Sequence, residues 1–144
     1  MDTPAVSSVV ERVLALLAAN PDGPVLVGLD GAVAAGKSTA AARIAEDLRT
    51  RGLEVAVVSA DGFLLSAARL RELGLVGRKG FPESFDRAAM AAFLRAVRAG
   101  AAPDAPRYSH DAYDVSADDI QGSAGAVVIF EGVNVLGADL AGLY

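Results

Sequence analysis

The chain has 144 residues, 53% of them hydrophobic and 22% charged, which is enough for one globular domain with a sizeable core. Its formal net charge of −5 argues against a surface that binds nucleic acid or anionic membranes, since such partners are bound mainly through clustered Lys and Arg. The sequence contains no cysteine, which excludes disulfides, thiolate metal sites and thiol nucleophiles.

The N-terminal segment predicts a lead-in helix and a linker, residues 1–24, before a core formed by residues 25–144 of a single domain. Apolar residues recur there at helical spacing up to the turn sequence Asn20-Pro21-Asp22-Gly23-Pro24. The segment lacks the pattern of a signal peptide, and no apolar run in the chain approaches the ~20 residues needed to cross a bilayer. We therefore expect a soluble, cytoplasmic protein.

A phosphate-binding loop is predicted at Gly31–Ser38, between the apolar strand Val25–Leu29 and a helix from Thr39 to Arg49. The spacing G-x-x-x-x-G-K-S lets backbone N–H groups converge on phosphate oxygens, and the helix directs its partly positive N-terminus at the same anion. Lys37 would reach the β- and γ-phosphates, and the Ser38 hydroxyl would hold Mg²⁺. A chance Gly/Ala-rich turn is the alternative, but the flanking strand and helix are the context that the motif requires.

The rest of the chain predicts an α/β fold with a parallel sheet flanked by helices. A second strand at Glu54–Ser59 completes a βαβ unit, and Asp61 follows that strand directly. A third strand at Ala126–Phe130 leads into Glu131, so both carboxylates are expected beside the phosphate loop at the carboxyl ends of the strands. The intervening segments are predicted as a short helical piece at 66–73, a loop at 74–85, a helix capped by Asp86, and a connection without regular structure at 101–125.

Five stretches resemble, in order and spacing, the bacterial type I pantothenate kinases of the P-loop kinase superfamily, which also includes uridine kinase and phosphoribulokinase. They are GAVAAGKST, SADGF, GLVGRKGFPESFD, PRYSHDAYDV and VIFEGVNVL. The resemblance runs from about Val25 to Leu136 and covers only the first part of the family's catalytic domain. We therefore expect a P-loop kinase fold that is truncated on its C-terminal side.

The resemblance implies ATP-dependent phosphorylation of pantothenate, with Asp61 and Lys37 as catalytic residues and Asp61 receiving the hydroxyl proton. It implies that pantothenate lies among Tyr108, His110 and Tyr113, and that Ser38 and Glu131 hold the metal ion or its waters. The residues implied to contact ATP and Mg²⁺ are Gly31, Ala34, Ala35, Gly36, Lys37, Ser38 and Thr39.

The same resemblance suggests a homodimer and inhibition by coenzyme A. The family carries an arginine soon after the loop threonines that helps to bind this inhibitor. Here Ala42 occupies that position, and Arg43 lies one residue on.

Each candidate residue also has an ordinary structural interpretation. Asp61 is also suited to cap the short helix that follows, Glu131 to end a strand, and His110 to be a surface residue without special role. Arg78 and Lys79 are either a solvated pair or contacts that bind phosphate or order the loop. The phenylalanines Phe63, Phe81 and Phe85 are expected to be packing anchors.

Two rival functions stay open at this point. One is a non-catalytic nucleotide-binding remnant that keeps the phosphate loop but cannot complete turnover. The other is a related P-loop kinase that acts on a nucleoside or a sugar, although the YSH and GFPES segments argue against it.

Overall fold

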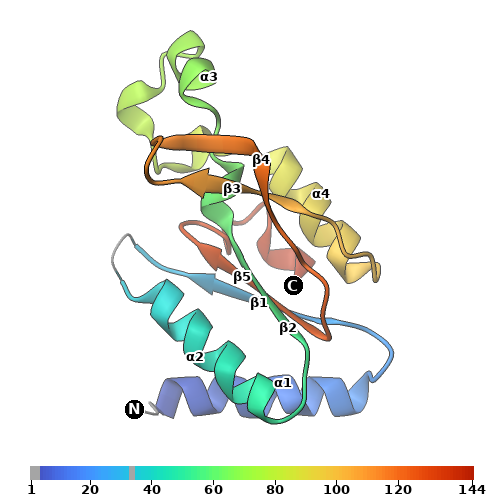
Figure 1. Ribbon diagram of the computed structural model, residues 1–144. Coiled ribbons are helices and arrows are strands. Elements are labelled where there is room, and N and C mark those ends of the chain that lie inside the picture. The colour runs from blue at the N-terminus through green and yellow to red at the C-terminus, as the bar shows by residue number, and fades with distance from the viewer. Residues whose placement is uncertain (1–3, 33–34) are drawn as a thin grey trace.

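The computed structural model describes residues 4–32 and 35–144, which form an α/β fold (Figure 1). Its helices are α1 (Pro4–Ala19), α2 (Lys37–Thr50), α3 (Ala67–Glu72) and α4 (Arg87–Arg98). Its strands are β1 (Val25–Asp30), β2 (Val55–Ser59), β3 (Ala105–Ser109), β4 (Asp114–Gln121) and β5 (Val127–Gly132). Single-turn 3₁₀ helices occur at Ala60–Phe63, Val76–Arg78, Pro82–Ser84 and Ala141–Leu143.

The central sheet is parallel and has the strand order β1-β5-β2 in the described part of the chain. All residues of β5 are buried, as expected for a middle strand that is covered on both faces. This arrangement confirms the predicted parallel sheet, and it places the strand that carries Glu131 directly beside the strand that leads into the phosphate loop.

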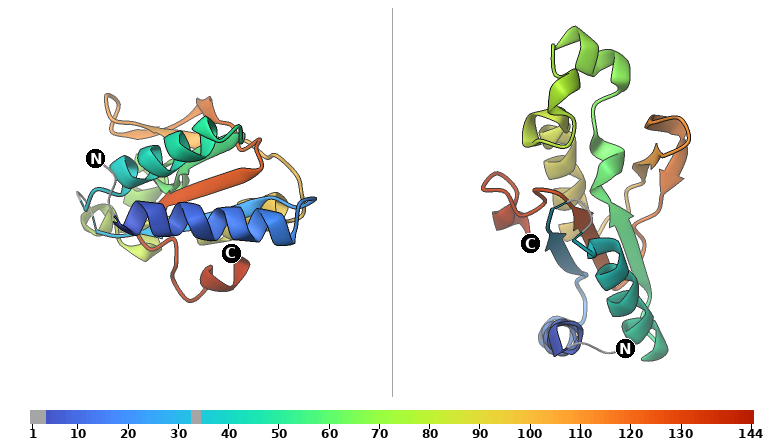
Figure 2. Two further views of the ribbon diagram at one scale, coloured as in Figure 1. Left: turned by 90° about the horizontal axis from the view of Figure 1, so that it is seen from below. Right: turned by 90° about the vertical axis from the view of Figure 1, so that its left-hand side faces the viewer.

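Helices cover both faces of this sheet (Figures 1 and 2). One face packs against α1 and α2 through residues such as Val10, Ile44 and Leu48, which are almost fully buried. The other face packs against α4, where the rings of Phe63, Phe93 and Phe130 have centroids 5.5 to 5.8 Å apart. Burial of these apolar side chains is the main source of the fold's stability. In the described residues, no helix is long and apolar enough to cross a membrane.

The residues that precede α4 and α2, Asp86 and Gly36, determine where these two helices begin. The Asp86 carboxylate accepts a hydrogen bond of 2.9 Å from the backbone N–H of Ala89, which confirms it as the N-cap of α4. The residue before α2, Gly36, has a φ of 85°, a left-handed conformation that a side chain would strain. The second glycine of the phosphate-loop motif is therefore required by the turn itself.

The prediction that residues 101–125 lack regular structure is wrong, because they form the antiparallel hairpin β3–β4. The strands contain Pro106 and several aspartates, so their composition is typical of a loop. The hairpin is stabilised by packing instead: β3 lies against the 3₁₀ helix Ala60–Phe63, close to Gly62. Figure 1 shows the hairpin beside the segment between β2 and α4 that contains α3, beyond the ends of the central strands.

The loop at 74–85 departs from its prediction in detail. It contains two of the 3₁₀ helices rather than only irregular chain. Phe85 is buried as expected, but Phe81 keeps 47% of its surface exposed, and the Arg78 guanidinium lies 3.7 Å above its ring. Phe81 is therefore not a core anchor, because its contact is with a cation at the surface.

Candidate active site

The phosphate loop connects the carboxyl end of β1 to the first residue of α2, Lys37. The Lys37 ammonium donates a hydrogen bond of 2.8 Å to the Ala32 carbonyl, which folds the side chain back over its own loop. Gly36, Ser38 and Thr39 are exposed at the start of the helix, where backbone N–H groups have no partner within the helix. Ala35 is exposed beside them and Gly31 is half-buried, whereas Ala34 lies outside the described residues.

A serine at the start of α2 and a carboxylate near the end of β5 meet in the site. The Ser38 hydroxyl donates a hydrogen bond of 3.3 Å to Oε1 of Glu131, although these residues lie 93 positions apart in the chain. Glu131 is only 7% exposed, and burial is the main cause that raises the pKa of its carboxyl above the ordinary value. The negative charge of Asp61 raises it further, against the lowering effects of the Ser38 hydroxyl, Lys37 and Ser59.

Asp61 belongs to the 3₁₀ helix that follows β2, and its charge acts on Glu131. Its backbone N–H donates a hydrogen bond of 3.3 Å to the Ser59 hydroxyl, which caps this helix. The next helix, α3, is capped by Ser66, so the interpretation of Asp61 as a cap of that helix is wrong. Glu131 likewise does not end its strand, because β5 continues to Gly132. The structure thus brings together Lys37, Ser38, Asp61 and Glu131.

The expected acceptor residues form a second group on the β3–β4 hairpin. The ring of Tyr108 lies edge-on to that of His110, with centroids 5.1 Å apart. The Lys79 ammonium donates a hydrogen bond of 2.8 Å to the Tyr108 hydroxyl and one of 3.0 Å to the Tyr113 carbonyl. His110 is exposed, and Tyr113 is 74% exposed with a φ of 53°.

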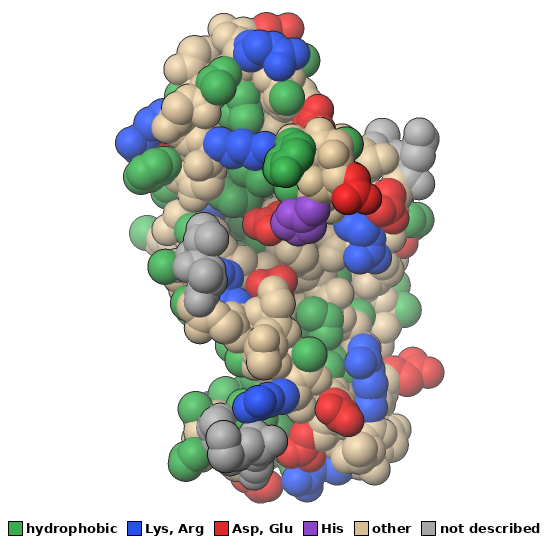
Figure 3. Space-filling view, turned by 60° about the vertical axis from the view of Figure 1, so that its left-hand side comes forward, with side chains coloured by type: hydrophobic (Ala, Val, Ile, Leu, Met, Phe, Trp, Pro, Cys, Tyr) green, Lys and Arg blue, Asp and Glu red, His purple; other side chains and the backbone are tan. Residues whose placement is uncertain are grey.

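These contacts show what the adjacent basic residues do. Arg78 forms an ion pair with Glu83 inside its own loop, whereas Lys79 connects that loop to the hairpin turn. Lys79 is therefore a loop-ordering contact rather than one half of a solvated pair. In Figure 3, basic, acidic and histidine side chains occur together on the upper half of one face of the molecule.

Ser38, Asp61 and Glu131 supply the hydroxyl and carboxylate oxygens that Mg²⁺ prefers. Burial is the first cause of the raised pKa of the Glu131 carboxyl and the charge of Asp61 the second, and a bound divalent cation would relieve the repulsion between the two carboxylates. The chemistry of these residues therefore fits a divalent cation such as Mg²⁺. Within residues 4–32 and 35–144, no group of three or more His, Cys, Asp or Glu side chains is arranged to hold a metal ion.

The Glu131→Gln variant is expected to be more stable than the parent chain at pH 7 when nucleotide and metal are removed with a chelator. Because the folded state raises the pKa of Glu131, ionisation of this carboxyl opposes folding as pH rises above about 4.5. The difference in Tm between variant and parent should be small at pH 4 and should grow towards pH 7. Thermal melts across this range check it, and a difference that stays constant with pH would contradict the assignment.

Three residues near the site, Asp30, Ser59 and Gln121, are not among the predicted site residues. Asp30, the last residue of β1, accepts hydrogen bonds from the backbone N–H groups of Asn134 and Leu136 at 3.0 and 2.9 Å, which fixes the loop after β5. Ser59 and Gln121 connect β2 to the hairpin. The position of Asp30 at a strand end was a detectable signal, but Gln121 lay in a segment that was predicted to be a loop.

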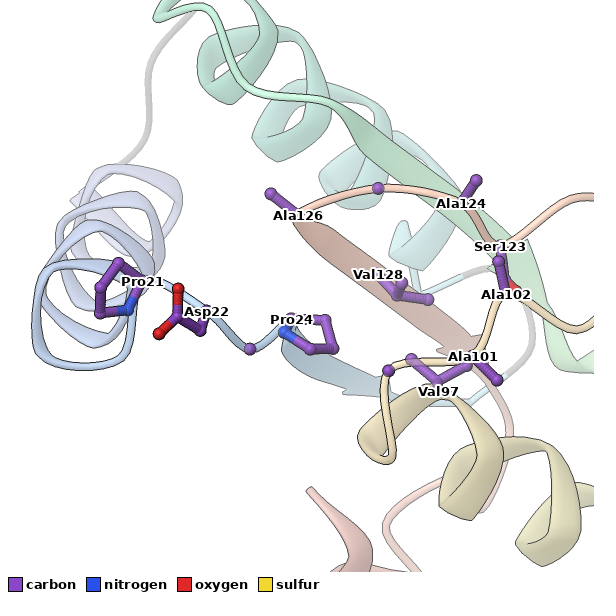
Figure 4. A pocket seen from close by; sticks show the side chains of 13 residues that line it. Pro21, Asp22, Pro24, Val97, Ala101, Ala102, Ser123, Ala124, Ala126 and Val128 are labelled. Carbon is purple, nitrogen blue, oxygen red and sulfur yellow. The ribbon is translucent and has the colours of Figure 1, made fainter.

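A cavity at the opposite end of the sheet is separate from this site. A cavity of about 300 Å³ lies between the loop Pro21–Pro24, the end of α4 and the start of β5 (Figure 4). Pro24 and Ala126 precede β1 and β5, so this cavity lies at the amino ends of the strands. It is therefore separate from the carboxyl-end cluster of Lys37, Ser38 and Glu131.

The chain is similar in structure to known kinases. A candidate fructose transport system kinase from Silicibacter sp. TM1040 superposes with a TM-score of 0.83 at 30% identity, over 96% of this chain and 70% of that one. The chain belongs to the P-loop kinases. The present chain also shares its fold with a possible uridine kinase from Bacillus stearothermophilus. The TM-score is 0.74 at 21% identity, over 96% of this chain and 75% of that one.

Curated relatives in sequence are named pantothenate kinase. The protein from Rhizobium rhizogenes is 45% identical over 119 residues, and that from Latilactobacillus sakei is 41% identical over 118 residues. Each alignment covers 78% of this P-loop kinase but only 35% and 38% of the respective relative, so the chain spans little more than a third of their length. No family model matches the chain.

Proposed function

We propose that this P-loop kinase transfers the γ-phosphoryl group of ATP, with Mg²⁺, to the primary hydroxyl of pantothenate. The observation that carries the proposal is the meeting of Ser38 and Glu131, with Oγ and Oε1 3.3 Å apart, next to Asp61 at the carboxyl ends of the strands. The names of the curated relatives support pantothenate as the acceptor. The hairpin aromatics and Lys79 offer hydroxyl, imidazole and ammonium groups suited to its hydroxyl, amide and carboxylate groups.

In this mechanism the protein mainly positions the reactants and neutralises charge, as phosphoryl transfer requires. Backbone N–H groups of the loop and the N-terminus of α2 would bind the phosphates, and Lys37 would turn from the Ala32 carbonyl to the transferred group. Asp61 would accept the proton of the acceptor hydroxyl. Mg²⁺ held by Ser38 and Glu131 would neutralise phosphate charge when bound.

An assay of ADP release tests this function on the 144-residue chain. Pantothenate, uridine and fructose are compared as acceptors, and Lys37→Ala provides the blank. The proposal predicts ADP release that depends on pantothenate and exceeds that with the other two acceptors. Preference for uridine or fructose would contradict the choice of substrate.

The alternative function, nucleotide binding without transfer, is favoured by the exposure of His110 and Tyr113. An acceptor pocket open to water favours hydrolysis or inactivity over transfer. Binding of ATP with no ADP release above the blank, or with release independent of any acceptor, would support this alternative and contradict pantothenate phosphorylation by this chain.

Three further properties belong to the same proposal. A homodimer would elute at twice the monomer mass in size-exclusion chromatography with light scattering. Coenzyme A would lower the rate of ADP release, although Ala42 occupies the position of the family's arginine. A cytoplasmic location would give the enzyme access to ATP.

A further inference from the structure

At Ser59, the last residue of β2, a side chain takes the place of a neighbouring strand on the outer edge of the sheet. β2 is an edge strand of the parallel sheet, and such a strand presents backbone groups that need partners. Both backbone groups of Ser59 meet the amide of Gln121: Oε1 accepts from the Ser59 N–H at 2.7 Å, and Nε2 donates to the Ser59 carbonyl at 3.1 Å. Because a carboxamide has the same donor and acceptor as a peptide group, it takes the place of a strand here.

The same amide also holds the hairpin. Nε2 of Gln121 donates a second hydrogen bond, of 2.7 Å, to the Pro106 carbonyl on β3. The side chain is 4% exposed, so both of its N–H groups and its oxygen have buried protein partners. A buried polar group that is fully paired fixes its neighbours, because loss of any partner leaves an unsatisfied donor or acceptor.

Ser59 connects this amide to the reacting end of the sheet. Its hydroxyl accepts the backbone N–H of Asp61 at 3.3 Å, and Ser59 lies opposite Glu131 in the register of β2 and β5. On the other side, Pro106 lies two residues before Tyr108 on the same strand. Gln121 thus links the end of β2, next to the two carboxylates, to the hairpin that carries the acceptor residues.

We infer that Gln121 is a positioning residue that sets the acceptor hairpin against Asp61. This inference rests on the proposed function for its catalytic consequence, but the structural link itself does not depend on activity. A displacement of about 1 Å in a reacting group can cost about a hundredfold in rate, so loosening this link should act on acceptor use more than on ATP use.

The kinetic test uses Gln121→Met, which keeps the size of the side chain and removes all three hydrogen bonds. We expect the KM for pantothenate to rise about tenfold or more and the KM for ATP to stay within about twofold. The matched control is Ser123→Ala, which removes another buried side-chain bond at the root of the hairpin, to the Pro103 carbonyl, without touching β2. Equal changes in acceptor KM in both variants, or no change in either, would overturn the inference.

Gln121→Asn keeps the amide on a shorter side chain. It replaces Gln121→Met in the kinetic test if the methionine variant does not fold. Its acceptor KM should lie between those of the parent and the methionine variant. A KM for pantothenate equal to that of the parent, in a folded Gln121→Asn chain, would also overturn the inference.

A second measurement needs no catalysis. The chain contains no cysteine, so spin labels can be placed at Ala42→Cys on α2 and Ala112→Cys in the hairpin turn without background. The distance distribution between them should be narrow in the parent and in Ser123→Ala, and broad in the Gln121 variants. A narrow distribution in those variants would overturn the link. If the parent shows no pantothenate kinase activity, the proposed function fails while this measurement still tests the role of Gln121.

Discussion

The Asp61→Asn variant should lower kcat for phosphoryl transfer by about a hundredfold or more while the affinity for ATP changes by less than about twofold. Asparagine has nearly the same shape as aspartate but cannot accept the proton of the acceptor hydroxyl. The backbone N–H of residue 61 would still bond to the Ser59 hydroxyl, so the local fold should persist. Steady-state kinetics with pantothenate and a separate titration of ATP binding measure the two effects.

Asp104→Asn is the matched control for this substitution. Asp104 is an exposed carboxylate between α4 and β3, at the other end of the hairpin, and its replacement should leave kcat unchanged. Asp61→Asn activity within about twofold of the parent would contradict the role of Asp61, since a general base contributes about 10²–10⁴. Equal losses in both variants would contradict it as well.

Gly62→Ala should destabilise the fold by about 3 kcal/mol or more, because overpacking against immobile atoms is among the most costly substitutions. A Cβ at this position would lie 1.6 Å from the Pro106 carbonyl oxygen, which is a backbone atom and not the end of a flexible side chain. Relief would require the hairpin to move, and that movement would break the hydrogen bond from Gln121 to the same carbonyl. Urea unfolding followed by circular dichroism measures the change.

Gly77→Ala provides the comparison within the same chain. Gly77 is exposed, and a Cβ there would meet no atom within 4 Å, so its stability should stay within about 0.5 kcal/mol of the parent. If both alanine variants unfold at the same urea concentration, the close approach of β3 to Gly62 is not a constraint on the fold.

The parts of the site that the sequence predicted are those that local chemistry determines. Gly36 and Lys37 stand at fixed spacing between an apolar strand and a helix, and this context alone specifies a loop with converging N–H groups. Glu131 ends an apolar run, so its place at the carboxyl edge follows from strand length and parallel order. Asp61 directly follows the apolar strand β2, so its place at the same carboxyl edge follows in the same way.

The hairpin could not be predicted because non-local packing determines it. β4 is rich in aspartate, and β3 contains Pro106, so neither strand shows the alternating apolar pattern of a half-buried strand. Their positions depend on a glycine that leaves room for a backbone carbonyl and on a glutamine that pairs with Ser59, 62 residues away. Contacts of this kind have no signature in a single sequence, and the role of Lys79 was undecided for the same reason.

The proposed site consists of a phosphate loop, a pair of carboxylates and a hairpin with acceptor groups. The chain spans little more than a third of the length of its curated relatives. Binding and phosphorylation of the acceptor are therefore the part of the proposed function that most needs a test. Binding of ATP alone would support the loop without reaching the hairpin. The decisive experiment must therefore follow the transferred group.

The most direct measurement is transfer of label from γ-labelled ATP to pantothenate by the 144-residue chain, with the product separated by chromatography. We expect labelled phosphopantothenate that requires Mg²⁺ and is absent with Lys37→Ala. Label found only in inorganic phosphate, or in an added nucleoside or sugar in preference to pantothenate, would contradict it.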